Sequence, residues 1–159
     1  MNLARLDAGR SRAGMAAGDE PVRFCTHCGA IGELGKDDAL AGRVCAECGL
    51  GVVLSCSREA LTENKAAFLV VKGDGEVSAA SVAADRALGA KAHSLEGRPL
   101  LELLEPGAAS QELSRRVTRA AGGDARVSMV PAVLADGAFV NARVGSCGEP
   151  RAALLVLLK

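Results

Sequence analysis

The sequence predicts an α+β protein in two parts, a small β module followed by a larger unit of antiparallel strands and helices. Three observations support this class. Four of the six cysteines fall between Cys25 and Cys48, in a segment that is rich in glycine and has few long apolar runs. From Phe68 onward, apolar runs of strand length alternate with glycine turns and helix-forming stretches. A chain of 159 residues is long enough for a small module beside a medium-sized domain.

The composition is that of a globular chain without a strong electrostatic bias. The 19 Lys and Arg residues balance the 19 Asp and Glu residues, 49% of residues are hydrophobic and 2% are aromatic. No run reaches the ~18 apolar residues of a membrane span, and the N-terminus lacks the continuous apolar core of a signal peptide. We therefore expect a cytoplasmic protein without a membrane partner. In a reducing compartment, Cys-x-x-Cys pairs are more typical of metal sites or redox groups than of structural disulfides.

The N-terminal part divides into three segments. Residues 1–20 carry scattered charges without periodicity, so they predict a disordered tail. Residues 21–56 hold the cysteine pairs and few long apolar runs, which predicts a module held together by something other than a core. Residues 57–66 begin with Ser57, a good N-cap, and continue with helix-forming residues, so they predict a short linker helix.

The second part, residues 67–159, begins with a predicted β-hairpin. The apolar run at 68–71 and a second strand at 76–80 flank a turn with the sequence Lys-Gly-Asp-Gly. Helical stretches follow, each bounded by a capping serine, a proline or glycines: 82–88, 99–104 and 109–121. The aliphatic residues of these elements predict a filled core rather than an open cavity.

Three further strands are predicted after the last helix, at 125–134, 138–146 and 151–158. Pro131 lacks the amide hydrogen that a strand paired on both sides must donate, so the first of these strands is predicted to lie at a sheet edge. The last strand is apolar on both faces, which predicts a central position in the sheet.

The six cysteines separate into a patterned set and two others. The sequence contains two Cys-x-x-Cys-Gly units, at 25–29 and 45–49, with sixteen residues between Cys28 and Cys45. Each pair of thiolates can close a tight turn onto one ion, and the glycine that follows permits the backbone conformation of the turn. Four thiolates complete a tetrahedral shell with no open position for a reacting water, so such a site is structural rather than catalytic. Cys56 and Cys147 lie outside this pattern and are expected to be small buried side chains.

Residues 24–53 resemble a zinc ribbon, a family of small metal-held β modules that bind proteins or nucleic acids. The resemblance implies one zinc ion with four ligands: Cys25, Cys28, Cys45 and Cys48. A rubredoxin-like iron centre has the same spacing, but that family surrounds its iron with aromatic residues, and here only Phe24 is nearby. A redox dithiol or a disulfide is the remaining alternative. His27 is a fifth candidate ligand, although a residue inside the turn is more typically solvent-facing.

The charge of the ribbon argues against nucleic acid. Between Pro21 and Leu50 there are three basic and four acidic residues, and a zinc ion with four thiolates adds a charge of about −2. A phosphate backbone would be repelled, and aromatic residues for base stacking are almost absent. We therefore expect the ribbon to contact protein or to have a purely structural role.

The second part resembles a PAS domain. The residues that carry the resemblance are AFLVVKGDGEVSAAS at 67–81, AADRALG at 83–89 and LEGRPLLELL at 95–104. The resemblance implies a five-stranded antiparallel sheet in the order 2-1-5-4-3, with helices packed on one face. It also implies a unit that senses a small molecule, light or redox state, or that forms a homodimer.

Candidate ligand residues in the second part are few. A flavin photosensor of this family needs a cysteine in the long helix and a haem sensor commonly takes a histidine from it, and residues 109–121 contain neither. His93, in the preceding loop, is a weak candidate for haem. Arg115 and Arg119 lie four residues apart and could hold a carboxylate or phosphate, although arginines on an amphipathic helix more often form a solvated face.

These patterns predict a cytoplasmic regulatory protein that acts by binding. The PAS-like unit is expected to sense a small molecule or to dimerise, and the ribbon is expected to contact a protein partner. One alternative is a transcription-linked factor whose ribbon contacts polymerase or DNA, and another is a rubredoxin-like redox protein. Enzyme activity is not expected, because no nucleophile elbow, phosphate loop or carboxylate pair is present.

Overall fold

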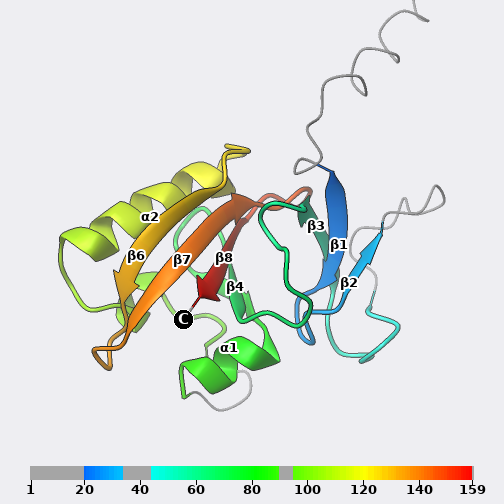
Figure 1. Ribbon diagram of the computed structural model, residues 1–159, viewed down its shortest axis with the longest axis horizontal. Helices are drawn as coiled ribbons and strands as arrows, with labels where there is room; N and C mark the ends of the chain where they lie inside the picture. Colours follow the sequence, from blue (N-terminus) through cyan, green and yellow to red (C-terminus); the bar gives the residue numbers. More distant parts are fainter. Residues whose placement is uncertain (1–19, 34–43, 90–94, 159) are drawn as a thin grey trace, which may run out of the picture.

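The computed structural model describes residues 20–33, 44–89 and 95–158, which form two antiparallel sheets and a few helices (Figure 1). The predicted disordered tail lies outside the described residues, except for Glu20. None of the described helices is long and apolar enough to cross a membrane.

The first sheet is small and has the strand order β2-β1-β3. Its strands are β1 (Pro21–Cys25), β2 (Ile31–Glu33) and β3 (Val53–Ser57). Val22 and Phe24 of β1 are paired with Cys56 and Leu54 of β3, so these four side chains share one face of the sheet. All four are buried, with Phe24 only 1% exposed. This sheet therefore has one apolar face that packs against another part of the molecule.

The second sheet has five antiparallel strands in the order β5-β4-β8-β7-β6. Its strands are β4 (Phe68–Val71), β5 (Val77–Ala80), β6 (Ser128–Val133), β7 (Phe139–Ser146) and β8 (Ala153–Leu158). Numbered within this sheet, the order is 2-1-5-4-3, which confirms the prediction. Pro131 lies in the edge strand β6, opposite Asn141, and the fully apolar β8 lies in the centre between β4 and β7.

The described helices pack against one face of the five-stranded sheet (Figure 1). They are α1 (Val82–Ala87), the 3-10 helix η3 (Leu100–Leu103) and α2 (Ala108–Ala121). Ser81 caps α1, since its hydroxyl accepts the Ala84 amide at 3.2 Å. α2 buries Leu113 and Val117 against the sheet, where they share a core with Leu155 of β8.

The opposite face of the five-stranded sheet is covered by the three-stranded sheet. Phe68 of β4 and Leu154 of β8 point to this side and form a second core with Phe24. The rings of Phe24 and Phe68 meet edge to face, with centroids 5.2 Å apart and planes at 87°. The two predicted parts therefore share a buried interface and do not form separate modules joined only by a linker.

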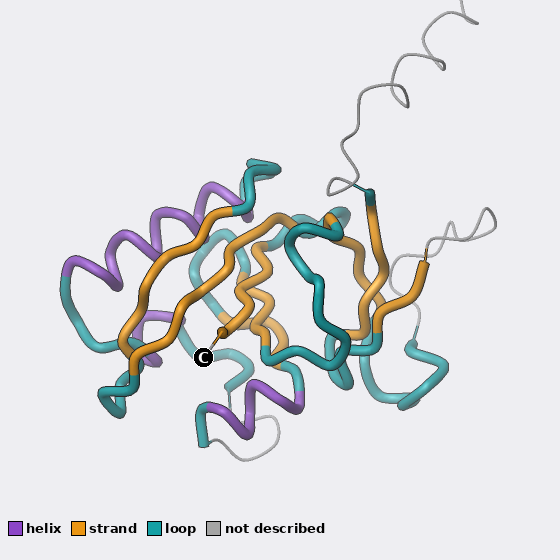
Figure 2. Tube along the Cα trace, viewed as in Figure 1, coloured by secondary structure: helices purple, strands orange, loops and turns teal. Residues whose placement is uncertain are grey.

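The segment predicted as a linker helix is not helical. Ser57 ends β3, residues 58–60 form a turn, and the chain then runs as loop to β4 (Figure 2). Ser57 does accept the Ala60 amide, at 3.2 Å, but this contact caps a turn rather than a helix. Ala60 and Leu61 are each only 1% exposed in the second core. Packing between the sheets thus outweighs the local helix propensity of the segment.

Candidate metal centre

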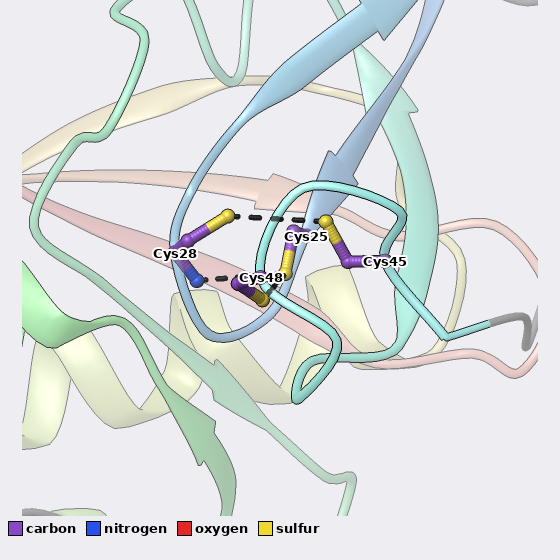
Figure 3. Close-up of side chains that lie close together, drawn as sticks. All are labelled: Cys25, Cys28, Cys45 and Cys48. Carbon is purple, nitrogen blue, oxygen red and sulfur yellow. Dashed lines mark hydrogen bonds between the residues drawn. The ribbon is translucent and has the colours of Figure 1, made fainter.

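The four patterned cysteines meet at one point of the three-stranded sheet, where β1 ends and the loop before β3 turns back (Figure 3). All four Sγ atoms lie within 4.8 Å of one another. Cys25 Sγ is 3.6 Å from Cys48 Sγ, and Cys28 Sγ is 3.9 Å from Cys45 Sγ. A tetrahedron with metal–sulfur bonds of ~2.3 Å has edges of roughly 3.8 Å. The sulfur positions therefore fit a single tetrahedral ion.

Each Cys-x-x-Cys-Gly unit forms the same tight turn, which we call the first cysteine turn (25–29) and the second cysteine turn (45–49). The Gly29 amide donates to the Cys25 carbonyl at 3.0 Å, and the Gly49 amide donates to the Cys45 carbonyl at 2.9 Å. Both glycines have positive φ, +74° and +67°, which side chains with a Cβ rarely adopt. The glycine that follows each cysteine pair thus has the conformational role predicted from the sequence.

A third glycine, Gly51, also belongs to the centre, although it lies outside both Cys-x-x-Cys-Gly units. A Cβ atom placed on Gly51 would overlap Cys25 Sγ and would lie 2.8 Å from His27 Cβ. The Gly51 carbonyl also accepts the Cys45 amide at 2.8 Å, which ties the second cysteine turn back to the chain. Only a residue without a side chain fits against the first cysteine turn at this position. The sequence feature that could have indicated this role is the second glycine in Cys48-Gly49-Leu50-Gly51.

Backbone amides and burial set the electrostatics of the thiols. The His27 and Cys28 amides each lie 3.4 Å from Cys25 Sγ. Burial raises the pKa of Cys25 to about 12, whereas the Gly51 and Leu50 amides lower the pKa of Cys48 to about 6. Four thiolates this close together repel one another unless a cation lies between them. The set can hold a metal ion, and its four protein ligands leave no open coordination position.

Hydrogen bonds tie the first cysteine turn and the start of β2 to segments that follow in the chain. The Lys65 amide donates to the Gly29 carbonyl at 2.9 Å, and the Ile31 amide donates to Asn64 Oδ1 at 3.1 Å. The Val82 amide, the first of α1, donates to the His27 carbonyl at 2.9 Å. His27 itself is half-buried in this turn, and the four-sulfur cluster found in the described residues does not include its side chain.

The other residues singled out in the sequence do not join the metal centre. Arg115 and Arg119 lie on the exposed face of α2. The guanidinium of Arg115 is 3.5 Å from Glu112 Oε2, and Arg116 also binds this carboxylate, at 2.8 Å. Hydrogen bonding to Arg116 lowers the pKa of Glu112. A carboxylate of the same helix thus already occupies part of the predicted anion fork. His93 lies outside the described residues.

A groove of about 670 Å³ opens beside α1, at the end of the five-stranded sheet. Its lining is almost entirely apolar and small: Ala67, Ala83, Ala87, Leu134, Ala138, Phe139, Val140 and Leu157, with Arg86 as the single charged residue. Elsewhere on this side of the sheet, aliphatic side chains of the helices and strands form a buried core. No local pattern predicts the groove, because its shape depends on how α1 is placed.

Three solved structures are similar to this chain. The PAS domain of a quorum-sensing receptor from Cronobacter turicensis, solved in complex with BDSF, has 12% identity and a TM-score of 0.50, with 62% of this chain and 97% of that chain covered. The PAS domain of nitrogen regulation protein NR(II) from Vibrio parahaemolyticus has 17% identity and a TM-score of 0.46, with 58% and 86% covered. The sensor region of a sensor histidine kinase has 23% identity and a TM-score of 0.46, with 58% and 38% covered.

No curated protein matches the sequence. The PAS fold family matches residues 61–146, which is more than half of the 159 residues. The match includes the hairpin, α1, α2 and the strands up to the end of β7, and β8 completes the sheet in the predicted order. The chain therefore belongs to the PAS fold family, with a four-cysteine module packed on its sheet.

Proposed function

We propose that this chain is a cytoplasmic regulatory protein that acts by binding and has no catalytic activity. In this proposal the PAS unit takes a small molecule, the cysteine module holds zinc, and the module's exposed surface contacts a protein partner. One observation carries the proposal. Helix α1 forms a wall of the 670 Å³ groove and also donates its first amide to the His27 carbonyl in the first cysteine turn.

The groove suggests the class of small molecule. Ala83 and Ala87 leave an apolar wall without bulky side chains, and Arg86 between them supplies one positive charge. Such a lining favours an apolar molecule that carries a single anionic group. A structurally similar PAS domain was solved with a small molecule, BDSF. When a molecule in the groove shifts α1, the hydrogen bond from Val82 transmits the shift to the first cysteine turn.

Zinc is the ion that the donor set favours. A closed shell of four cysteine thiolates is typical of structural zinc, and it also accommodates iron in redox proteins. The redox alternative lacks the surrounding aromatic residues, since the chain contains three Phe and no Trp or Tyr. Thiolate-bound iron would give the purified protein a visible colour, whereas zinc would leave it colourless.

A protein partner is favoured by the surface beside the second cysteine turn. Val44, Leu50 and Val52 are 63%, 71% and 41% exposed, and Val44 and Val52 are paired with each other. A group of exposed apolar residues in a small module is typical of a protein contact. A homodimer would have to use another surface than the sheet face opposite the helices, because the three-stranded sheet covers that face.

Native mass spectrometry of the chain purified without added metal tests the proposal. We expect the mass of one zinc ion per chain, and an additional organic mass when a ligand is retained in the groove. The variant Ala87→Leu, which narrows the groove, should lose the organic mass and keep the zinc. A chain without metal would refute the zinc assignment, and an organic mass that persists in Ala87→Leu would refute the assignment of the groove.

A further inference from the structure

Two cysteines outside the metal centre face each other where the two sheets meet. Cys56 of β3 and Cys147, which follows β7, form an isolated antiparallel pair. The Gly148 amide donates to the Ser55 carbonyl at 2.9 Å, and the Cys147 amide donates to the Ala152 carbonyl at 2.9 Å. Both cysteines belong to the second core and are 4% and 5% exposed.

The position of these hydrogen bonds defines the type of pair. The bond from Gly148 to Ser55 joins the residues that flank the cysteines, which is the pattern of a non-hydrogen-bonded antiparallel pair. Opposed residues of this type have Cα atoms about 4.5 Å apart and side chains on the same face. A disulfide requires a Cα separation of ~4.4–6.8 Å, so the two thiols can be joined without displacing either sheet.

The pair lies next to a glycine and lines a surface hollow. A Cβ atom placed on Gly148 would lie 2.5 Å from Ser55 Oγ, so a larger residue at this position would require the Ser55 side chain to rotate. Cys56 and Cys147 line a hollow of about 250 Å³ whose rim consists of small residues: Pro21, Ser55, Ser57, Ala125, Ser146 and Gly148. The hollow is therefore the side from which oxidised glutathione would approach the thiols.

We propose that Cys56 and Cys147 are a redox modification site, at which a reversible disulfide locks the three-stranded sheet onto the PAS sheet. One thiolate attacks a sulfur of oxidised glutathione and releases one reduced glutathione. The second thiolate then attacks the protein sulfur of the mixed disulfide and releases the other. The two protein thiols lose two electrons and two protons, and the glutathione disulfide gains both.

The disulfide would act on the arrangement of the two sheets rather than on the metal. The four metal ligands form a separate cluster that does not include Cys56 or Cys147. Burial raises the pKa of Cys147 to about 12, and it raises the pKa of Cys56 as well. The thiols are therefore protonated at neutral pH, and oxidation is expected to be slower than at an exposed cysteine and to accelerate as the pH rises.

Peptide mapping of the metal-loaded full chain after treatment with oxidised glutathione tests this proposal. Trypsin cleavage should give residues 44–58 joined to residues 144–151, with the mass lowered by about 2 Da for one disulfide. Fragmentation must place the bond at Cys56, because residues 44–58 also contain Cys45 and Cys48. The denatured chain should show four titratable thiols in place of six, and dithiothreitol should restore all six.

Two variants test whether the cross-link requires both Cys56 and Cys147. Cys56→Ala and Cys147→Ala should each abolish the cross-link while keeping the metal content and circular dichroism of the parent chain. In the oxidised parent, amide hydrogens of β1 and β3 should exchange on the order of tenfold more slowly than in the reduced parent. A bond to Cys45 or Cys48, a product with glutathione alone, or no reaction even at raised pH would each overturn the proposal.

Discussion

Replacing Val82 by proline would test whether α1 and the metal centre are coupled. Val82 is the first residue of α1, and its amide donates to the His27 carbonyl at 2.9 Å. Proline has no amide hydrogen, but it is well tolerated at the first position of a helix. The preceding Ser81 has φ −69° and ψ 155°, an extended conformation that a following proline favours. Val82→Pro therefore removes this one hydrogen bond and leaves the helix start intact.

The expected loss of metal affinity follows from the one hydrogen bond that Val82→Pro removes. A neutral backbone hydrogen bond contributes about 0.5–1.5 kcal/mol net, which corresponds to roughly a 2- to 13-fold change in an equilibrium constant. Because the bond holds the first cysteine turn in its metal-binding conformation, we expect the metal affinity of Val82→Pro to fall by that factor. Val82→Ala keeps the amide and removes the same partly buried side chain, so it is the matched control.

The assay is competition for zinc with a coloured chelator, measured for the parent chain and for both variants. Circular dichroism should show the same helix content in all three, which would exclude unfolding of α1. Val82→Ala should retain the parental affinity within a factor of about two. If Val82→Pro bound zinc as tightly as Val82→Ala, the hydrogen bond between α1 and His27 would not affect metal affinity. The proposal that a shift of α1 is transmitted from the groove to the first cysteine turn would then be refuted.

Three further predictions concern stability and the metal centre. Phe24→Ala should lower the free energy of unfolding by about 3–5 kcal/mol in denaturant titrations, while Phe139→Ala, at a side chain 84% exposed, should have little effect. Gly51→Ala should reduce zinc stoichiometry in native mass spectra, because the added methyl group overlaps Cys25 Sγ, and full zinc binding would contradict this packing. Glu63→Gln should cost about 1 kcal/mol or less at pH 7, because Glu63 binds Arg143 Nη1 at 3.1 Å at a partly exposed position. Arg143 lowers the pKa of Glu63 below its ordinary 4.5, so this contribution is present above pH 4.5 and should vanish in urea titrations as the pH falls further.

The full strand order was implied by the resemblance to PAS domains, whereas local residue types indicated two of its positions and the four-cysteine cluster. Pro131 can belong only to a strand with one neighbour, and the apolar run at 153–158 requires cover on both faces. The cysteine spacing brings four sulfurs together once each pair forms a turn, and Gly29 and Gly49 have the positive φ that this turn needs. These features depend either on contacts within a short stretch of chain or on four residues of the same type, the cysteines, that can bind one ion.

The docking of the three-stranded sheet and the loop at 57–66 could not be predicted in the same way. Phe24 and Phe68 are each apolar residues in separate strands, and nothing local indicates that their rings meet. Ser57 begins a stretch with good helix propensity, but Leu61 becomes buried between two sheets that the local sequence does not reveal. Gly51 was missed for the same reason, because its partner is Cys25, which lies twenty-six positions earlier in the chain.

Through the shared core, a metal bound at the four cysteines would affect more than the three-stranded sheet. Phe68, Val70, Leu154 and Val156 of the PAS sheet are buried under the three-stranded sheet, with exposures of 0–2%. Metal binding in small zinc modules supplies about 10–16 kcal/mol of folding free energy, so removal of the metal should loosen this cover.

We expect chelation to expose the outer face of the PAS sheet and to increase the fluorescence of a dye that binds apolar surface. The apolar face should then also pair with a second chain, which size-exclusion chromatography would detect as a dimer. A metal-free chain that stayed monomeric and bound no dye would show that the core between the sheets, and not the metal, holds the module in place.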